Sequence, residues 1–151
     1  MTAMRRLAFA MLLLALASAY GAKDETVEEL KSRFENARPE NRPELGIRIA
    51  QRQLSEADKL YREGNVDRAR SDVEDIVTYS EKARDAAIQT RKRLKNVEID
   101  VRKLAEKLRD IKRTLAFEDQ APVEQAVRRL EDVRTTLLKE MFAKENKKEK
   151  R

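Results

Sequence analysis

Apolar residues recur every three and four positions along most of this chain, and the longest such run begins at Val66 and ends at Leu115. Spacing of three and four places side chains on one face of a helix, which is the pattern of a coiled-coil seam. No Gly or Pro interrupts residues 66–117, so the pattern predicts one long central helix. All but two of the fifteen seam positions are apolar, the exceptions being Ser80 and Thr90. The positions are Val66, Ala69, Val73, Ile76, Ser80, Ala83, Ala87, Thr90, Leu94, Val97, Val101, Leu104, Leu108, Ile111 and Leu115.

The predicted central helix has one weak segment, which is QTRKRLKN at residues 89–96. Only Thr90 and Leu94 continue the seam there, and four cations surround them. If the helix breaks, we expect the break in this segment. The fold would then be a compact four-helix bundle instead of an extended one.

Three shorter helices are predicted from the same spacing, at Thr26–Ala37, Pro43–Glu63 and Ala121–Lys144. Asp24 or Thr26 can cap the first of them, because short polar side chains accept hydrogen bonds from the free amides of a first turn. The second and third of these helices, Pro43–Glu63 and Ala121–Lys144, are long enough to lie along the central helix in succession.

Gly64 and Asn65 are predicted to form the turn before the central helix. Glycine adopts the left-handed conformation that closes a helix end, and Asn can cap the helix that follows. A seam is stable only when it is buried, so each turn must fold a short helix back onto the central one. The predicted fold class is therefore all-α, with antiparallel helical hairpins or a coiled coil on one long central helix. A hairpin of two helices leaves one side of its seam partly bare, so a homodimer is an alternative.

The first 22 residues, MTAMRRLAFAMLLLALASAYGA, have two arginines, an apolar run and then small residues, which is the layout of a secretory signal peptide. We predict cleavage after Ala19, with Ala17 and Gly21 as alternatives. An uncleaved anchor is the other reading, but the apolar stretch is shorter than the roughly 20 residues that span a bilayer. The sequence thus predicts an exported protein, either periplasmic or secreted. The predicted organisation is a signal peptide at 1–19, a first helix and linker at 20–42, a hairpin with the central helix at 43–117, an antiparallel helix at 118–144 and a disordered basic tail at 145–151.

The composition excludes several kinds of chemistry. The chain has no Cys and no His, so disulfides, thiolate sites and histidine acid–base catalysis are ruled out. Its carboxylates stand beside cations at helical spacing, and no Gly-rich phosphate loop or nucleophile elbow is present. We predict a protein that is not an enzyme and that has no cofactor, no metal and no small-molecule substrate.

The net charge of +6 is a mild basic bias, of which Arg5 and Arg6 belong to the leader. The densest cluster of cations is a candidate anion- or partner-binding site, and it comprises Arg91, Lys92, Arg93 and Lys95. A solvated helix surface is the alternative interpretation of that cluster. Weak contact with a polyanion or a membrane surface is compatible with the same residues and with the basic tail.

Residues 57–73, ADKLYREGNVDRARSDV, resemble the turn between the two helices of a tetratricopeptide repeat. Ala57 and Ala69 occupy the small positions of that family, Leu60 and Tyr61 the large ones, and Gly64 the turn position, with Val73 in a large position beyond. The family's helix-ending Pro is absent, because Glu81 stands there, and no second copy follows at a step of 34 residues. A plain helical hairpin with the same turn chemistry is the alternative.

These features favour an exported, non-enzymatic α-helical scaffold or adaptor that binds other proteins through its helical surfaces. One alternative is a periplasmic holdase chaperone, since small, basic, exported and coiled-coil-rich chains are similar in type to the Skp-like chaperones. This chain lacks the strand segments of their trimer body. The other alternative is a polyanion-binding envelope protein.

Overall fold

The computed structural model describes residues 24–149, and every regular element in that range is helical. The prediction of an all-α fold is therefore confirmed. The predicted signal peptide lies outside the described residues, as do residues 150–151. In chain order the elements are α2 (Val27–Asn36), the 3-10 turn η2 (Pro39–Asn41), α3 (Arg42–Arg62), α4 (Val66–Thr90), α5 (Leu94–Thr114) and α6 (Phe117–Glu149).

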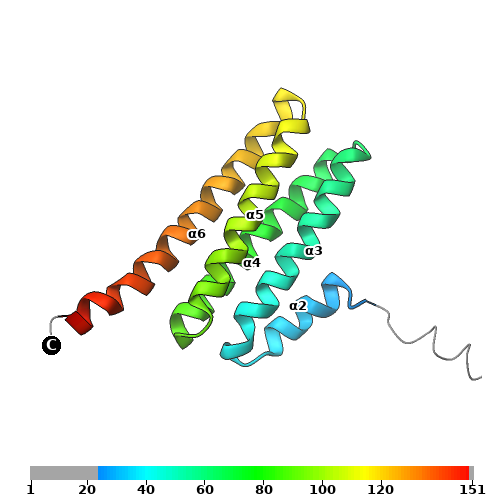
Figure 1. The fold of residues 1–151 in the computed structure, drawn as a ribbon. Coiled ribbons are helices and arrows are strands. Elements are labelled where there is room, and N and C mark those ends of the chain that lie inside the picture. The colour runs from blue at the N-terminus through cyan, green and yellow to red at the C-terminus, as the bar shows by residue number, and fades with distance from the viewer. Residues whose placement is uncertain (1–23, 150–151) are drawn as a thin grey trace, which may run out of the picture.

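Four helices form a bundle of two antiparallel hairpins, α3 with α4 and α5 with α6 (Figure 1). The hairpins dock so that α4 packs on α6 and α3 packs on α5. Helices α4 and α5 follow each other in sequence, yet the loop between them crosses a diagonal of the bundle. As a result α3 and α5 are parallel neighbours, and so are α4 and α6 (Figure 1).

The prediction of one continuous central helix is wrong, because the chain reverses between Thr90 and Leu94. Arg91 and Arg93 both adopt left-handed backbone conformations there, with φ of 58° and 62°. The break falls in the segment that the sequence marked as weakest. It lets both halves of the seam face one shared core, which buries more apolar surface than an extended helix covered by one neighbour on each half.

The seam assignment itself holds for most of its positions. Residues from all four bundle helices form one buried cluster, which includes Ile76, Leu104, Leu108, Leu130 and Leu137. A smaller cluster lies where α2 covers α3 and α4, and there Phe34 and Tyr79 meet edge to face at 5.5 Å between ring centroids. The four seam residues at element ends stay partly exposed, namely Val66, Thr90, Leu94 and Leu115.

The turns at the helix ends agree with the sequence in part. Thr26 caps α2, and Thr26 and Glu29 exchange side-chain and backbone hydrogen bonds as a capping box. Gly64 has a φ of +78°, and the amide of Asn65 donates to the carbonyl of Leu60, which closes α3 in a Schellman motif. Asn65 occupies the N-cap position of α4, but its side chain makes no capping hydrogen bond.

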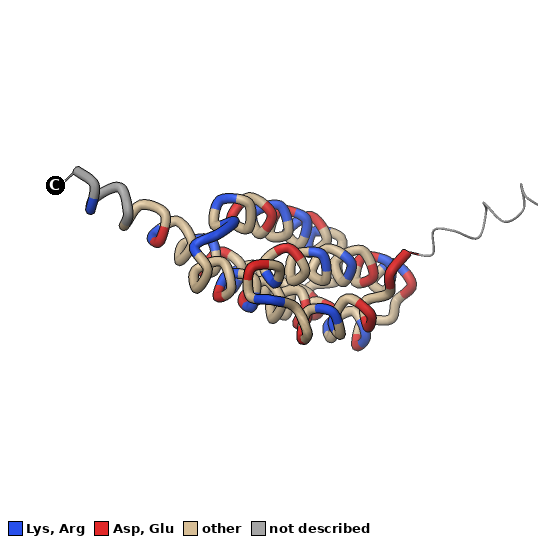
Figure 2. Tube along the Cα trace, turned by 90° about the horizontal axis from the view of Figure 1, so that it is seen from below, with Lys and Arg blue, Asp and Glu red and all other residues tan. Residues whose placement is uncertain are grey.

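Helix α6 is longer than predicted at both ends. It begins at Phe117 instead of Ala121, with Pro122 inside it, and its backbone stays helical to Glu149, through most of the segment predicted to be disordered. Its 33 residues correspond to about 50 Å, against about 32 Å for the 21 residues of α5. The end of α6 therefore projects beyond the bundle (Figures 1 and 2). Within residues 24–149 no helix is both long enough and apolar enough to cross a bilayer.

Candidate functional site: a groove between α3 and α5

A groove runs between the parallel helices α3 and α5, on the side of the bundle away from α4 and α6. Its larger chamber has a volume of about 450 Å³. The chamber is lined by four residues of each helix: Gln51, Leu54, Ser55, Asp58, Lys107, Asp110, Ile111 and Thr114. A smaller chamber of about 140 Å³ continues along the same two helices to Pro43 and Arg93, and Gln51 lines both. The groove thus follows most of the length of the interface.

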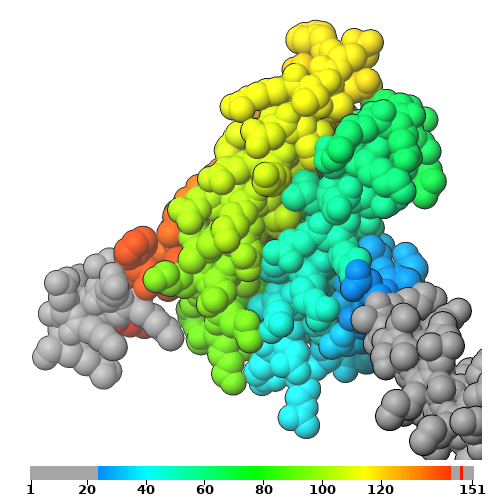
Figure 3. Space-filling model, turned by 45° about the vertical axis from the view of Figure 1, so that its right-hand side comes forward, coloured from blue at the N-terminus to red at the C-terminus, as the bar shows by residue number. Residues whose placement is uncertain are grey.

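The groove widens toward the Gly64 turn because the two hairpins separate there, as Figure 3 shows for the upper ends of α3 and α5. Small residues such as Ala57 and Ala69 bring α3 close to α4, so α3 follows its hairpin partner and not α5. Each hairpin is packed tightly within itself, and the contact between α3 and α5 is looser. As a result, a groove remains between α3 and α5, and residues of these two helices alone line its larger chamber.

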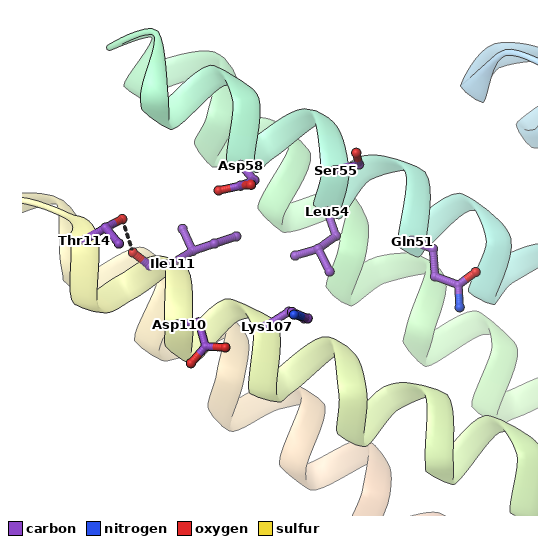
Figure 4. Close-up of a pocket in the computed structure, with 8 residues that line it drawn as sticks. All are labelled: Gln51, Leu54, Ser55, Asp58, Lys107, Asp110, Ile111 and Thr114. Atoms are coloured by element: carbon purple, nitrogen blue, oxygen red, sulfur yellow. Dashed lines mark hydrogen bonds between the residues drawn. The ribbon is translucent and has the colours of Figure 1, made fainter.

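The groove has an apolar floor and a polar rim. Leu54 is partly buried and Ile111 is buried, and the close-up in Figure 4 shows them approaching each other from the two helices. On the rim, Asp58 pairs with Arg62 one turn along the same helix, and Asp110 accepts a hydrogen bond from Arg113 at 3.2 Å. Lys107 is exposed and forms no ion pair with the described residues. An apolar strip flanked by charges is the surface that an amphipathic helix recognises.

The larger chamber of the groove is lined by two hydroxyl groups and two carboxylates. Its two hydroxyl groups belong to Ser55 and Thr114, and Thr114 donates to the carbonyl oxygen of Ile111 at 2.7 Å, a bond within its own helix (Figure 4). In the smaller chamber, burial raises the pKa of Asp100, and the nearby charge of Lys103 partly opposes that shift. Glu44 lines the same chamber and lies 3.0 Å from Arg93.

The four cations predicted to form an anion-binding cluster are divided by the structure. Arg91 donates to Glu140 of α6 at 2.6 Å, and Arg93 lies 3.0 Å from Glu44 of α3. Lys92 and Lys95 are exposed. The two arginines thus fasten the turn to both hairpins. Anion binding by this cluster stays a prediction that would depend mainly on the two lysines.

A network of charged side chains joins α5 to α6. Arg134 of α6 donates to the buried Glu98 of α5 at 2.8 Å and to Glu131 at 3.1 Å, and Glu131 in turn accepts from Arg109 at 2.7 Å. The hydrogen bond to Glu98 raises the pKa of Arg134. Figure 2 shows cations and anions interleaved along the chain. Ion pairs of Arg109, Lys112 and Arg134 thus join α5 to α6.

Sequence reasoning missed the groove, although it placed both floor residues on apolar helix faces. Leu54 and Ile111 carry the same three-and-four spacing as fully buried neighbours. What distinguishes them is the separation of the two hairpins, which depends on long-range packing. Gly46 was also missed: a Cβ there would lie 2.9 Å from the carbonyl oxygen of Tyr79, so this glycine lets α3 approach α4. Its signal in the sequence is a glycine inside an otherwise helical pattern.

No family model, curated protein or solved structure matches this chain. The residues that resemble one tetratricopeptide turn form the junction of α3 and α4, a helix–turn–helix within the bundle.

Proposed function

We propose that this protein is an exported, non-enzymatic α-helical adaptor that binds a partner protein in the groove between α3 and α5. The observation that carries the proposal is the groove itself, a strip along two helices with Leu54 and Ile111 at its base and charges on its rim. A partner helix would bury the exposed part of this strip. Its polar side chains would meet Lys107 and the two rim aspartates.

Site-specific photo-crosslinking tests this proposal. A photo-reactive amino acid at Ser55 would stand on the groove, and the same group at Ser71 would stand on the exposed face of α4. We expect one defined adduct from envelope extract at Ser55 and none of that mass at Ser71. The rim variant Lys107→Glu should reduce the Ser55 adduct without changing the melting temperature, because Lys107 is exposed.

Other outcomes separate the alternatives. Many adducts at Ser55, together with suppressed aggregation of an unfolded client, would favour the holdase chaperone. Retention on heparin that salt reverses steeply, and that Lys92→Gln with Lys95→Gln abolishes, would favour the polyanion-binding protein. Equal adducts at both serines, or none, would contradict binding in the groove.

A further inference from the structure

The junction between α4 and α5 lacks the residues that usually end and begin helices. Helix α4 has no basic residue in its last turn, and α5 has no acidic residue in its first turn. Arg93 stands at the N-cap of α5 and makes no side-chain capping bond, and Lys95 follows where a positive charge opposes the helix dipole. The turn between α3 and α4, by contrast, has a glycine in the left-handed position, at Gly64. Nothing local therefore specifies a reversal at residues 91–93.

The turn also holds two non-glycine residues in an unfavourable conformation. Arg91 and Arg93 are the only residues other than glycine with positive φ in the described part of the chain. A Cβ in the left-handed region lies too close to the following carbonyl oxygen, so such residues persist only where tertiary contacts hold them. Here those contacts include the ion pairs with Glu140 and Glu44.

The seam passes through the turn without a change of register. Ala83, Ala87, Thr90, Leu94 and Val97 follow steps of four, three, four and three. If residues 91–93 became helical, the buried faces of α4 and α5 would form one continuous apolar stripe. That helix would run from Val66 to Thr114, and its 49 residues would measure about 74 Å.

We propose that a second copy of this chain is a partner of this fold, through exchange of hairpins. In the exchanged dimer, α4 and α5 of each chain form one straight helix. The α3–α4 hairpin of one chain then packs on the α5–α6 hairpin of the other. The surface that receives the second copy is the interface already present within one chain, where α4 meets α6 and α3 meets α5. Its complementarity is guaranteed because the same residues meet in both forms.

The balance between the two forms depends on protein concentration. Straightening relieves the four left-handed residues of two chains and adds helical hydrogen bonds, whereas association removes translational freedom. Short strained hinge loops are the usual origin of such exchange. In the exchanged dimer, α3 of each chain would pack on α5 of the other chain. The dimer would therefore display two grooves.

A matched pair of variants at Arg91 tests the exchange. Arg91→Ala and Arg91→Gly both remove the ion pair with Glu140, and they differ only in the Cβ atom. Glycine relieves the turn and disfavours the straight helix, whereas alanine keeps the strain and favours the helix. We expect the dimer association constant of Arg91→Gly to be at least about 100-fold below that of Arg91→Ala. The measurement is light scattering after refolding over a range of protein concentrations.

Crosslinking then identifies the kind of dimer. Glu81→Cys with Arg129→Cys places the two thiols across α4 and α6, where Arg129 lies 3.2 Å from Glu81, in a chain that has no other cysteine. A short bismaleimide should join these sites within one chain in the monomer and between chains in the exchanged dimer. The control is Lys112→Cys with Glu124→Cys, inside the α5–α6 hairpin, which should crosslink within one chain in both forms.

The outcomes decide the proposal without reference to the groove, since no partner protein is present. Crosslinks between chains at the first pair, in a dimer that Arg91→Gly weakens, would support exchange. A dimer with only intrachain crosslinks would be a side-by-side dimer and would overturn it. Absence of any dimer in wild type and Arg91→Ala, or equal dimer fractions for both Arg91 variants, would also overturn it.

Discussion

At the scale of single residues, two glycines serve opposite purposes. Gly46 is required for space, because an added Cβ would meet the Tyr79 carbonyl oxygen at 2.9 Å and the Ala83 Cβ at 3.0 Å. Gly64 is required for its backbone angle, since nothing lies within 4 Å of the position of its Cβ. The sequence revealed the role of Gly64 through its place between two helical patterns. It could not reveal that of Gly46, which depends on how closely α4 approaches.

Substituting each glycine by alanine should separate these effects. Gly46→Ala should lower the free energy of unfolding by about 1–3 kcal/mol, because backbone must move to admit the methyl group. Gly64→Ala should lower it by about 1–2 kcal/mol through backbone strain alone. Urea denaturation measures both. A Gly46→Ala variant as stable as wild type would contradict the close approach of α3 and α4.

Asp72 is a residue whose charge opposes folding. Burial raises its pKa, and Glu56 and Asp75 raise it further, whereas Arg68 and Lys31 act against them. A carboxyl group whose folded pKa is raised destabilises the folded state at pH values above that pKa. This penalty disappears when the pH falls below the unfolded pKa, because the group is then neutral in both states.

Asp72→Asn should therefore raise the melting temperature near pH 7 and leave it unchanged near pH 3. The control Asp132→Asn, on the exposed side of α6, makes the same change of charge and should have a smaller effect near pH 7. Thermal unfolding followed by circular dichroism at both pH values is the measurement. Equal gains for the two variants would indicate a general charge effect.

At the scale of elements, helix type and most helix ends followed from spacing, prolines and caps. The exception is the junction of α4 and α5, where local signals favour a continuous helix and the shared core of two hairpins favours a reversal. The weak seam of residues 89–96 indicated where a break could fall, but the reversal itself depends on long-range burial. The groove was hidden for the same reason, since Leu54 has the spacing of a core residue.

The contact between α5 and α6 includes a buried charge, Glu98, whose helical spacing to neighbouring cations predicted an exposed surface residue. Glu98 is 7% exposed and accepts from Arg134. Arg134→Met should destabilise the protein by about 1–3 kcal/mol, because it leaves the Glu98 carboxylate without a charged partner. The double variant with Glu98→Gln should regain part of that loss. Thermal denaturation of the single and double variants tests this, and additive losses would show that the two side chains act separately.

At the scale of the whole molecule, the two hairpins depend on each other because one core cluster contains residues from both. Leu108 of α5 is fully buried within it. Leu108→Ala should cost about 2–5 kcal/mol and should weaken α3 and α4 as well as α5 and α6. Hydrogen exchange would report this as a loss of protection in both hairpins. Loss confined to α5 and α6 would mean that the hairpins unfold independently.

The parallel alignment of α3 and α5 also gives the groove a polarity. The carboxyl ends of both helices lie at its wide end, so their dipoles place partial negative charge there, in addition to Asp58 and Asp110. A guest helix would be attracted with its amino terminus toward that end. The guest helix would therefore lie antiparallel to α3 and α5. Basic residues in its first turn would favour this direction over the reverse.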